Sequence, residues 1–116
     1  DALPISQQRS LSGKQIEELA HLSGTTPEEY IADQMVYPAN LLAKNISGYA
    51  LCEFTIDKEG VILRPHILKA THSEFAEEAL RIVKGMPKWS PALAGGKPTD
   101  SNYTLYIPFR PKLYKP

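Results

Sequence analysis

The 116-residue chain has the length of one domain, and its hydrophobic and charged contents of 42% and 22% are typical of an ordinary globular protein. Thirteen basic and thirteen acidic residues cancel, so the composition gives no electrostatic footprint for nucleic acid. One cysteine excludes an internal disulfide and metal sites built on several thiolates. No apolar run approaches the ~20 residues that span a bilayer and no leader is present, so we expect a processed form or part of a longer protein.

The start of the chain is predicted to be irregular and then helical. Residues 1–11 show no periodicity and are interpreted as disordered or as the end of a linker. Residues 12–22 open on the capping-box pattern of Ser12 and Gln15 and continue with apolar residues at helical spacing. This pattern predicts a helix that Gly24 ends, within a single domain spanning 12–116.

Two more helices are predicted before the first strand. Thr26 at the N-cap, followed by a proline and two glutamates, begins a helix that runs to about Met35. Pro38 begins a shorter helix through Lys44, and Asn45 is suited to a left-handed stop.

After these helices the apolar period changes to two. Residues 50–56 alternate between an apolar and a mixed face, and 57–60 supply a tight turn with glycine at its end. The return strand spans 61–70 and contains Pro65, which cannot donate a ladder hydrogen bond. This second strand is therefore predicted at a sheet edge, with the first strand at the centre.

A helix and a last strand complete the predicted fold. Thr71 or Ser73 caps a helix that Gly85 and Pro87 end, and apolar residues alternate again through 103–109. The predicted fold is α+β in two layers: a three-stranded antiparallel sheet in the order 2-1-3, with helices packed on one face. The predicted core is Cys52, Phe54, Ile56, Phe75, Ala79, Val83, Leu105 and Ile107.

No pattern in the chain indicates catalysis, a cofactor or a metal. The three histidines lie apart, without the spacing of a metal site, and Cys52 lies on an apolar strand face where it is expected to be inert. Glu77 and Glu78 diverge on a helical wheel, so they do not form an acid–base pair. Trp89, between two prolines, is interpreted as a lid over the core, and Tyr37 as a structural aromatic.

Several short motifs follow one another in a specific order: Tyr37-Pro38, the strand and turn from Gly48 to Gly60, Glu-Ala-Leu-Arg at 78–81, Met-Pro-Lys-Trp-Ser-Pro at 86–91, and Tyr-Ile-Pro-Phe at 106–109. In that order and spacing they resemble the C-terminal domain of TonB, the periplasmic energy transducer. The resemblance covers about residues 26–110, the expected core of the domain.

The resemblance implies a binding domain without enzymatic activity. Such domains add the TonB-box peptide of an outer-membrane transporter to the free edge of their last strand. Here that edge is Ser101, Asn102, Tyr103, Thr104, Leu105 and Tyr106. A glutamine three positions before the Tyr-Pro pair also contacts the partner, and Gln34 occupies that position. We expect the side chains of Gln34, Tyr103 and Tyr106 to tune selectivity.

The resemblance also implies a place in the cell. The domain is expected in the periplasm, with its parent anchored in the inner membrane and coupled to a proton-driven complex there. The transporters would carry siderophores and other iron complexes, cobalamin or glycans. Two alternatives remain open: a stand-alone secreted peptide-binding module, and a sensor domain appended to a membrane metallopeptidase. The free edge is equally compatible with a monomer or an edge-paired homodimer.

Overall fold

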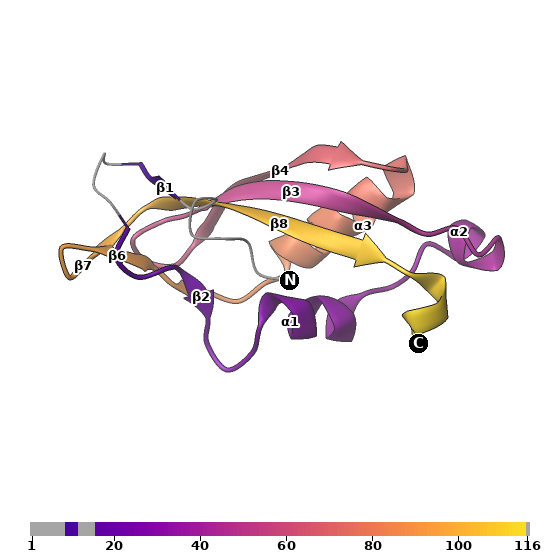
Figure 1. The fold of residues 1–116 in the computed structure, drawn as a ribbon, viewed down its shortest axis with the longest axis horizontal. Coiled ribbons are helices and arrows are strands. Elements are labelled where there is room, and N and C mark those ends of the chain that lie inside the picture. The colour runs from indigo at the N-terminus through magenta and orange to yellow at the C-terminus, as the bar shows by residue number, and fades with distance from the viewer. Residues whose placement is uncertain (1–8, 12–15, 116) are drawn as a thin grey trace.

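A long antiparallel sheet organises the molecule (Figure 1). The computed structural model describes residues 9–11 and 16–115. The sheet order is β1-β8-β3-β4, and its strands are β1 (Arg9–Ser10), β3 (Gly48–Ile56), β4 (Ile62–Ala70) and β8 (Ser101–Phe109). The three long strands confirm the predicted order 2-1-3, with β3 at the centre and β8 and β4 on either side.

The two ladders of β3 differ in regularity. β3 and β8 pair without interruption over nine residues, whereas the β3–β4 ladder shifts register twice. At one shift Arg64 has φ 53°, just before Pro65. A proline and a positive φ bend a strand and interrupt its donors, which is how natural sheets protect an edge. The prediction of Pro65 on an outer strand is confirmed.

The turn between β3 and β4 is fixed by one side chain. The Asp57 carboxylate accepts the N–H groups of Glu59 and Val61, both at 2.9 Å. Gly60 has φ 85°, and a Cβ there would collide with the carbonyl oxygen of Trp89. The Trp89 N–H in turn donates to the Gly60 carbonyl at 2.9 Å. Glycine is therefore required at position 60 both by φ and by packing.

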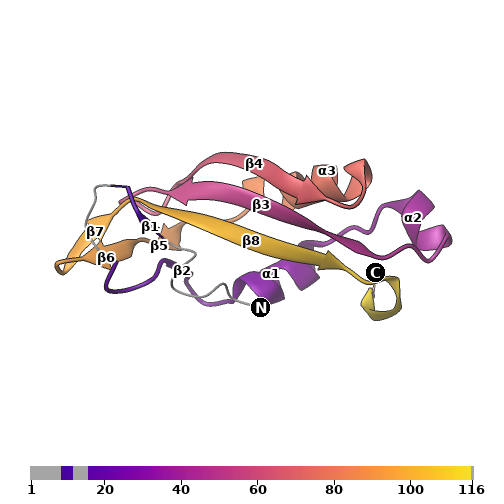
Figure 2. The same cartoon turned by 45° about the horizontal axis from the view of Figure 1, so that its top comes forward.

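Three helices accompany the sheet: α1 (Pro27–Gln34), α2 (Ala39–Ala43) and α3 (Ser73–Lys84). Thr26 is the N-cap of α1, as predicted, and it forms a capping box with Glu29. Asn45 ends the turn after α2 with φ 57°, also as predicted. α3 packs on β3 and β4, while α1 lies alongside β8 (Figures 1 and 2). The predicted cap of α3 is wrong: His72 occupies the N-cap, because the Thr71 hydroxyl instead accepts the Tyr49 N–H at 3.0 Å.

The core lies between the sheet and these helices. All eight predicted core residues are buried. At one end Trp89 packs at 5.0 Å from the Tyr103 ring and 5.7 Å from the Phe54 ring, so it covers the core as predicted. At the other end Phe75 and Phe109 stack at 4.2 Å, with Tyr37 edge-on to both.

The predicted helix at 12–22 is wrong for the part that the structure describes, and residues 12–15 lie outside that part. Glu18 forms a bridge with Leu93, and β2 (His21–Leu22) pairs with β5 (Trp89–Ser90). Ile16, Leu19 and Ala20 have helical spacing, whereas Ala20 and Leu22 are spaced as on one face of a strand, and both of these are buried by the extended chain. Tertiary pairing therefore decides the conformation of this segment.

Four further short elements lie in segments predicted as loop or without structure. β6 (Ala92–Ala94) and β7 (Lys97–Thr99) form a hairpin across Gly95 and Gly96, both at positive φ as a two-residue turn of this kind requires. β1 falls within the segment interpreted as disordered or linker, of which residues 1–8 lie outside the described part. A 3-10 turn, η2 (Pro111–Leu113), follows β8.

Candidate functional site

The side chains of β8 alternate strictly between the core and the open face of the sheet. Ser101, Tyr103 and Leu105 are buried, whereas Thr104 and Tyr106 are half-buried on the opposite face. Tyr106 stacks on Tyr49 of β3 with ring centroids 5.5 Å apart. This alternation separates the predicted partner-binding residues into two sets with different surroundings.

The backbone of β8 also alternates, between its two neighbouring strands. The Leu11 N–H donates to the Asp100 carbonyl at 3.3 Å, and Arg9 is the register partner of Asn102. Because polar groups in an antiparallel ladder turn to alternate sides, Asn102, Thr104 and every second residue beyond direct their N–H and C=O away from β3. On the other side of β3, the Tyr49 carbonyl accepts the Thr71 N–H from the β4 side, as the same alternation requires.

Beyond Asn102, no described strand pairs with this edge of β8. Thr104 and Tyr106 each present an N–H and a C=O there, and Pro108 presents a C=O alone. A proline with its nitrogen directed outward leaves the β3 ladder intact, and this explains why Pro108 is tolerated in a paired strand. The exposed backbone is therefore a short template for one more strand.

Two of the predicted edge residues are already paired. β1 lies against Ser101 and Asn102, so the open edge begins after Asn102 rather than at Ser101. Asn102 also contacts the Thr55 hydroxyl at 3.0 Å across the β3–β8 ladder. The template available to another chain is shorter than the sequence suggests.

The expectation that the Tyr103 side chain tunes selectivity needs correction. Tyr103 is only 3% exposed and stacks on Phe54 at 5.6 Å. Burial raises the pKa of its phenol, with a further contribution from the charge of Glu28. Inward-facing residues of a paired strand form the core, so Tyr103 and Leu105 support the edge without touching a chain laid along it.

Gln34 is the last residue of α1, and its side chain is exposed. Its carbonyl accepts a hydrogen bond from the Arg81 guanidinium at 2.6 Å. Arg81 also forms two 2.7 Å hydrogen bonds to the Glu78 carboxylate, which in turn accepts the Val36 N–H at 2.7 Å. These hydrogen bonds to Glu78 raise the pKa of Arg81. The network fixes the end of α1 relative to α3.

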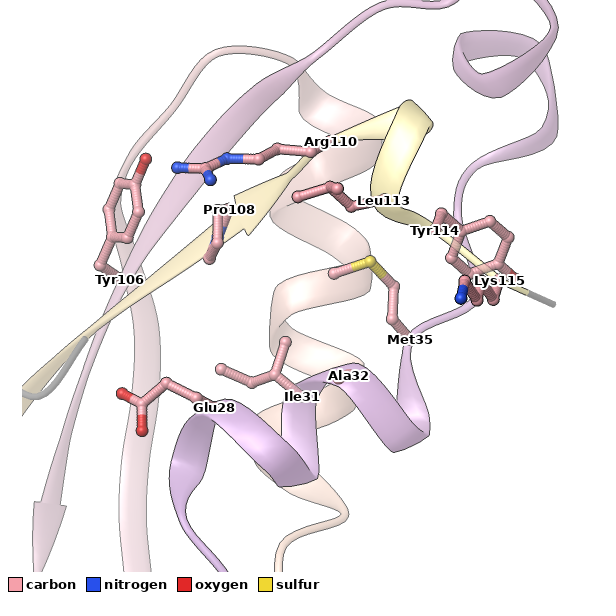
Figure 3. Close-up of a pocket in the computed structure, with 10 residues that line it drawn as sticks. All are labelled: Glu28, Ile31, Ala32, Met35, Tyr106, Pro108, Arg110, Leu113, Tyr114 and Lys115. Carbon is pink, nitrogen blue, oxygen red and sulfur yellow. The ribbon is translucent and has the colours of Figure 1, made fainter.

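A groove lies beside the open edge, between α1, β8 and the η2 turn (Figure 3). Its volume is about 350 Å³, at the small end of the range of about 300–1,000 Å³ found for ligand pockets. The lining residues are Glu28, Ile31, Ala32, Met35, Tyr106, Pro108, Arg110, Leu113, Tyr114 and Lys115. Gln34 is not among them, although its neighbour Met35 is.

Sequence reasoning found only Tyr106 of this groove. The apolar wall on α1 could have been inferred from Ile31 and Met35, which lie four residues apart on one helical face. The contribution of the C-terminal turn had no sequence signal, because it depends on Tyr114 packing 5.5 Å from Tyr37.

Nothing in the described part of the chain resembles a chemical centre. No group of three or more His, Cys, Asp or Glu residues there could hold a metal ion. Burial raises the pKa of the Cys52 thiol to about 11, so it stays protonated and unreactive near neutral pH. Glu77 is exposed and Glu78 is buried against Arg81, which confirms that the two carboxylates diverge.

Comparison with known protein families gives a match. A family model described as the Gram-negative bacterial TonB protein C-terminal matches residues 33–111, which is most of the chain. The matched range includes Gln34 and the whole of β8. No curated protein matches the chain. Among the described residues, no helix has the length and apolar content needed to cross a membrane.

Proposed function

This chain belongs to the family of Gram-negative TonB C-terminal domains, and on that premise we propose that it binds the TonB-box peptide of an outer-membrane transporter by β-augmentation of β8. The family is a periplasmic, non-catalytic, energy-transducing one whose members interact with outer-membrane transporters. The peptide-binding step on this chain, the transporter and its cargo belong to the proposal.

The open edge of β8 is the observation that carries the proposal. Thr104 and Tyr106 offer two outward N–H groups, and these two residues and Pro108 offer three outward carbonyls. Each hydrogen bond made there contributes about 1 kcal/mol net. Main-chain pairing of this kind gives affinity, while pockets for alternate side chains give specificity.

The contrast between the two sheet edges supports the same assignment. β4 carries two register shifts, Pro65, and the charged Arg64 and Lys69, which are features that discourage pairing. β8 carries no charged residue between Asp100 and Arg110 and pairs regularly with β3 throughout. Only the β8 side therefore favours an added strand.

Energy coupling would require the rest of the parent protein. We propose that the domain works in the periplasm, tethered to an inner-membrane, proton-driven complex, and pulls on the transporter through the added strand. A secreted peptide-binding module or a sensor domain of a membrane metallopeptidase would use the same edge. The sequence preceding the domain in its parent distinguishes them: one span with a proline-rich spacer, a cleaved leader, or several spans.

Substitution at Thr104 tests the proposal. Thr104→Pro deletes the outward N–H without touching the β3 ladder, so TonB-box peptide affinity should fall by about fivefold to tenfold, the value of one hydrogen bond. Thr104→Val is the matched control, because it keeps the N–H and the branched shape and should bind within about twofold of the parent chain. Isothermal titration calorimetry measures both.

The opposite pattern would remove the basis of the proposal. Equal affinity of Thr104→Pro and Thr104→Val, with both variants folded by circular dichroism, would mean that the peptide does not pair with this edge. Absence of binding by the unaltered chain at millimolar peptide would mean that the domain does not grip transporters in this way.

A further inference from the structure

We propose that the groove beside β8 selects the sequence of the added strand: one aliphatic side chain directed at α1 and, on the same face of that strand, a carboxylate directed at Arg110. This inference rests on the proposed function, because it concerns the side chains of a peptide already paired with β8. It assigns to the groove the specificity that main-chain hydrogen bonds do not supply.

The groove lies beside the edge of β8 to which another strand would add. A strand added to β8 would lie about 4.8 Å from it, on the side where Tyr106 and Pro108 form the groove wall. Ile31, Ala32 and Met35 of α1 form the facing wall (Figure 3). Alternate side chains of the added strand point to opposite faces, so every second one is directed at the helix.

Most side chains that line the groove are apolar or aromatic. The side chains on the α1 wall are apolar, and Leu113 of the η2 turn is 68% exposed in the free domain. Burying such a side chain against a partner is favourable at about 25 cal/mol per Å² of apolar surface. Met35 is unbranched and adapts to the shape of what it contacts. These properties suit an aliphatic side chain in the peptide.

The groove also carries basic side chains. Arg110 and Lys115 line it, and no described residue forms an ion pair with either side chain. In Figure 3 the guanidinium of Arg110 extends over Pro108 toward Tyr106, whereas Lys115 lies beside Tyr114 on the opposite side of the groove and Glu28 lies on α1. A guanidinium binds a carboxylate through paired hydrogen bonds. The part of the groove beside Arg110 therefore favours an acidic residue in the peptide.

The groove is built largely from parts of this chain that flank the family match at 33–111. The lining residues outside that range are Glu28, Ile31, Ala32, Leu113, Tyr114 and Lys115. The strand that offers the backbone lies inside the match, and the walls that read the side chains lie mostly outside it.

The probes are fluorescein-labelled nonapeptides of alternating Thr and Ser with Leu at position 5 and Glu at position 3 or 7, since residues two apart share a face of a strand. The matched probes carry Ser for Leu or Gln for Glu. We expect each change to weaken binding about fivefold or more, as for loss of an aliphatic contact or a charge-assisted hydrogen bond. The better of the two Glu positions reports the direction of the added strand.

Protein variants locate the effect. Arg110→Gln should abolish the preference for Glu over Gln, whereas Lys112→Gln, on the same turn but outside the lining, should leave it intact. Ala32→Trp should fill the groove and abolish the preference for Leu, whereas Ala43→Trp, at an exposed position of α2, should not. Melting curves confirm that each variant is folded.

The outcomes separate this inference from the proposed function. Binding that Thr104→Pro weakens but that is indifferent to Leu, Glu, Arg110 and Ala32 would leave strand addition standing and overturn the selective groove. Absence of binding by every peptide would overturn both. If sedimentation shows a dimer that Ala32→Trp dissolves, while peptide preference is unaffected, the groove holds a second copy and the peptide assignment is wrong.

Discussion

At the scale of single residues, successive residues of β8 have two different roles: some pack in the core, and the others present their backbone at the open edge. Tyr103 and Leu105 contribute their side chains to the core, while Thr104 and Tyr106 contribute backbone groups to the edge. Cys52 shows how strongly the core shapes chemistry, because burial is the main cause that raises the pKa of its thiol to about 11. A residue that could be mistaken for a nucleophile is therefore a packed apolar group.

The Cys52 thiol should make stability fall with pH. Its pKa is raised in the folded domain, so between the usual thiol pKa and about pH 11 the unfolded chain has lost the proton and the folded chain keeps it. The free energy of unfolding should decrease across this window. Urea unfolding at pH 7.5 and pH 10 should show a larger decrease for the parent chain than for Cys52→Ala, which lacks the titrating group. An equal decrease in both proteins would contradict the prediction.

At the scale of elements, the predictable parts are those in which local chemistry and tertiary packing agree. The Thr26 N-cap of α1, the left-handed Asn45 and the Asp57 turn are each set within a few residues, and the structure has them as predicted. The segment from Ile16 to Leu22 differs because its apolar residues fit two periods and distant strands decide between them.

The candidate site was predicted only in part for the same reason. The last strand could be placed from its alternation, but its covered first two residues depend on β1, and its groove depends on α1 and η2 packing beside it. Those are contacts between segments far apart in sequence, and no local pattern encodes them. The free backbone of Thr104 and Tyr106 was within reach of sequence reasoning, whereas the role of Met35 or Leu113 was not.

The β3–β4 turn provides a test at this scale. Gly60→Ala should destabilise the domain more than Gly24→Ala, because both glycines have positive φ, 85° and 80°, but only at position 60 would the new methyl group meet the Trp89 carbonyl. Gly24→Ala should cost about 1 kcal/mol from φ alone, and Gly60→Ala clearly more. Equal losses in chemical denaturation would mean that the packing against Trp89 does not constrain the turn.

At the scale of the whole molecule, the domain is asymmetric in a way that suits binding. One side of the sheet ends in β4, which is irregular and carries charge, and the other ends in β8, which is regular and open beyond Asn102. The helix α1 and the C-terminal turn stand beside the open side and form the groove (Figures 1 and 3). Backbone template and side-chain groove therefore occupy one place on the molecule.

Amide hydrogen exchange along β8, with and without a bound TonB-box peptide, tests strand addition most directly. The account predicts protection with a period of two: the outward Thr104 and Tyr106 amides should become protected on binding, while the Tyr103 and Leu105 amides, already bonded to β3, should change little. Nuclear magnetic resonance resolves these amides individually. Uniform protection across the strand, or protection confined to the turn at 57–60 with Thr104 and Tyr106 unchanged, would contradict it.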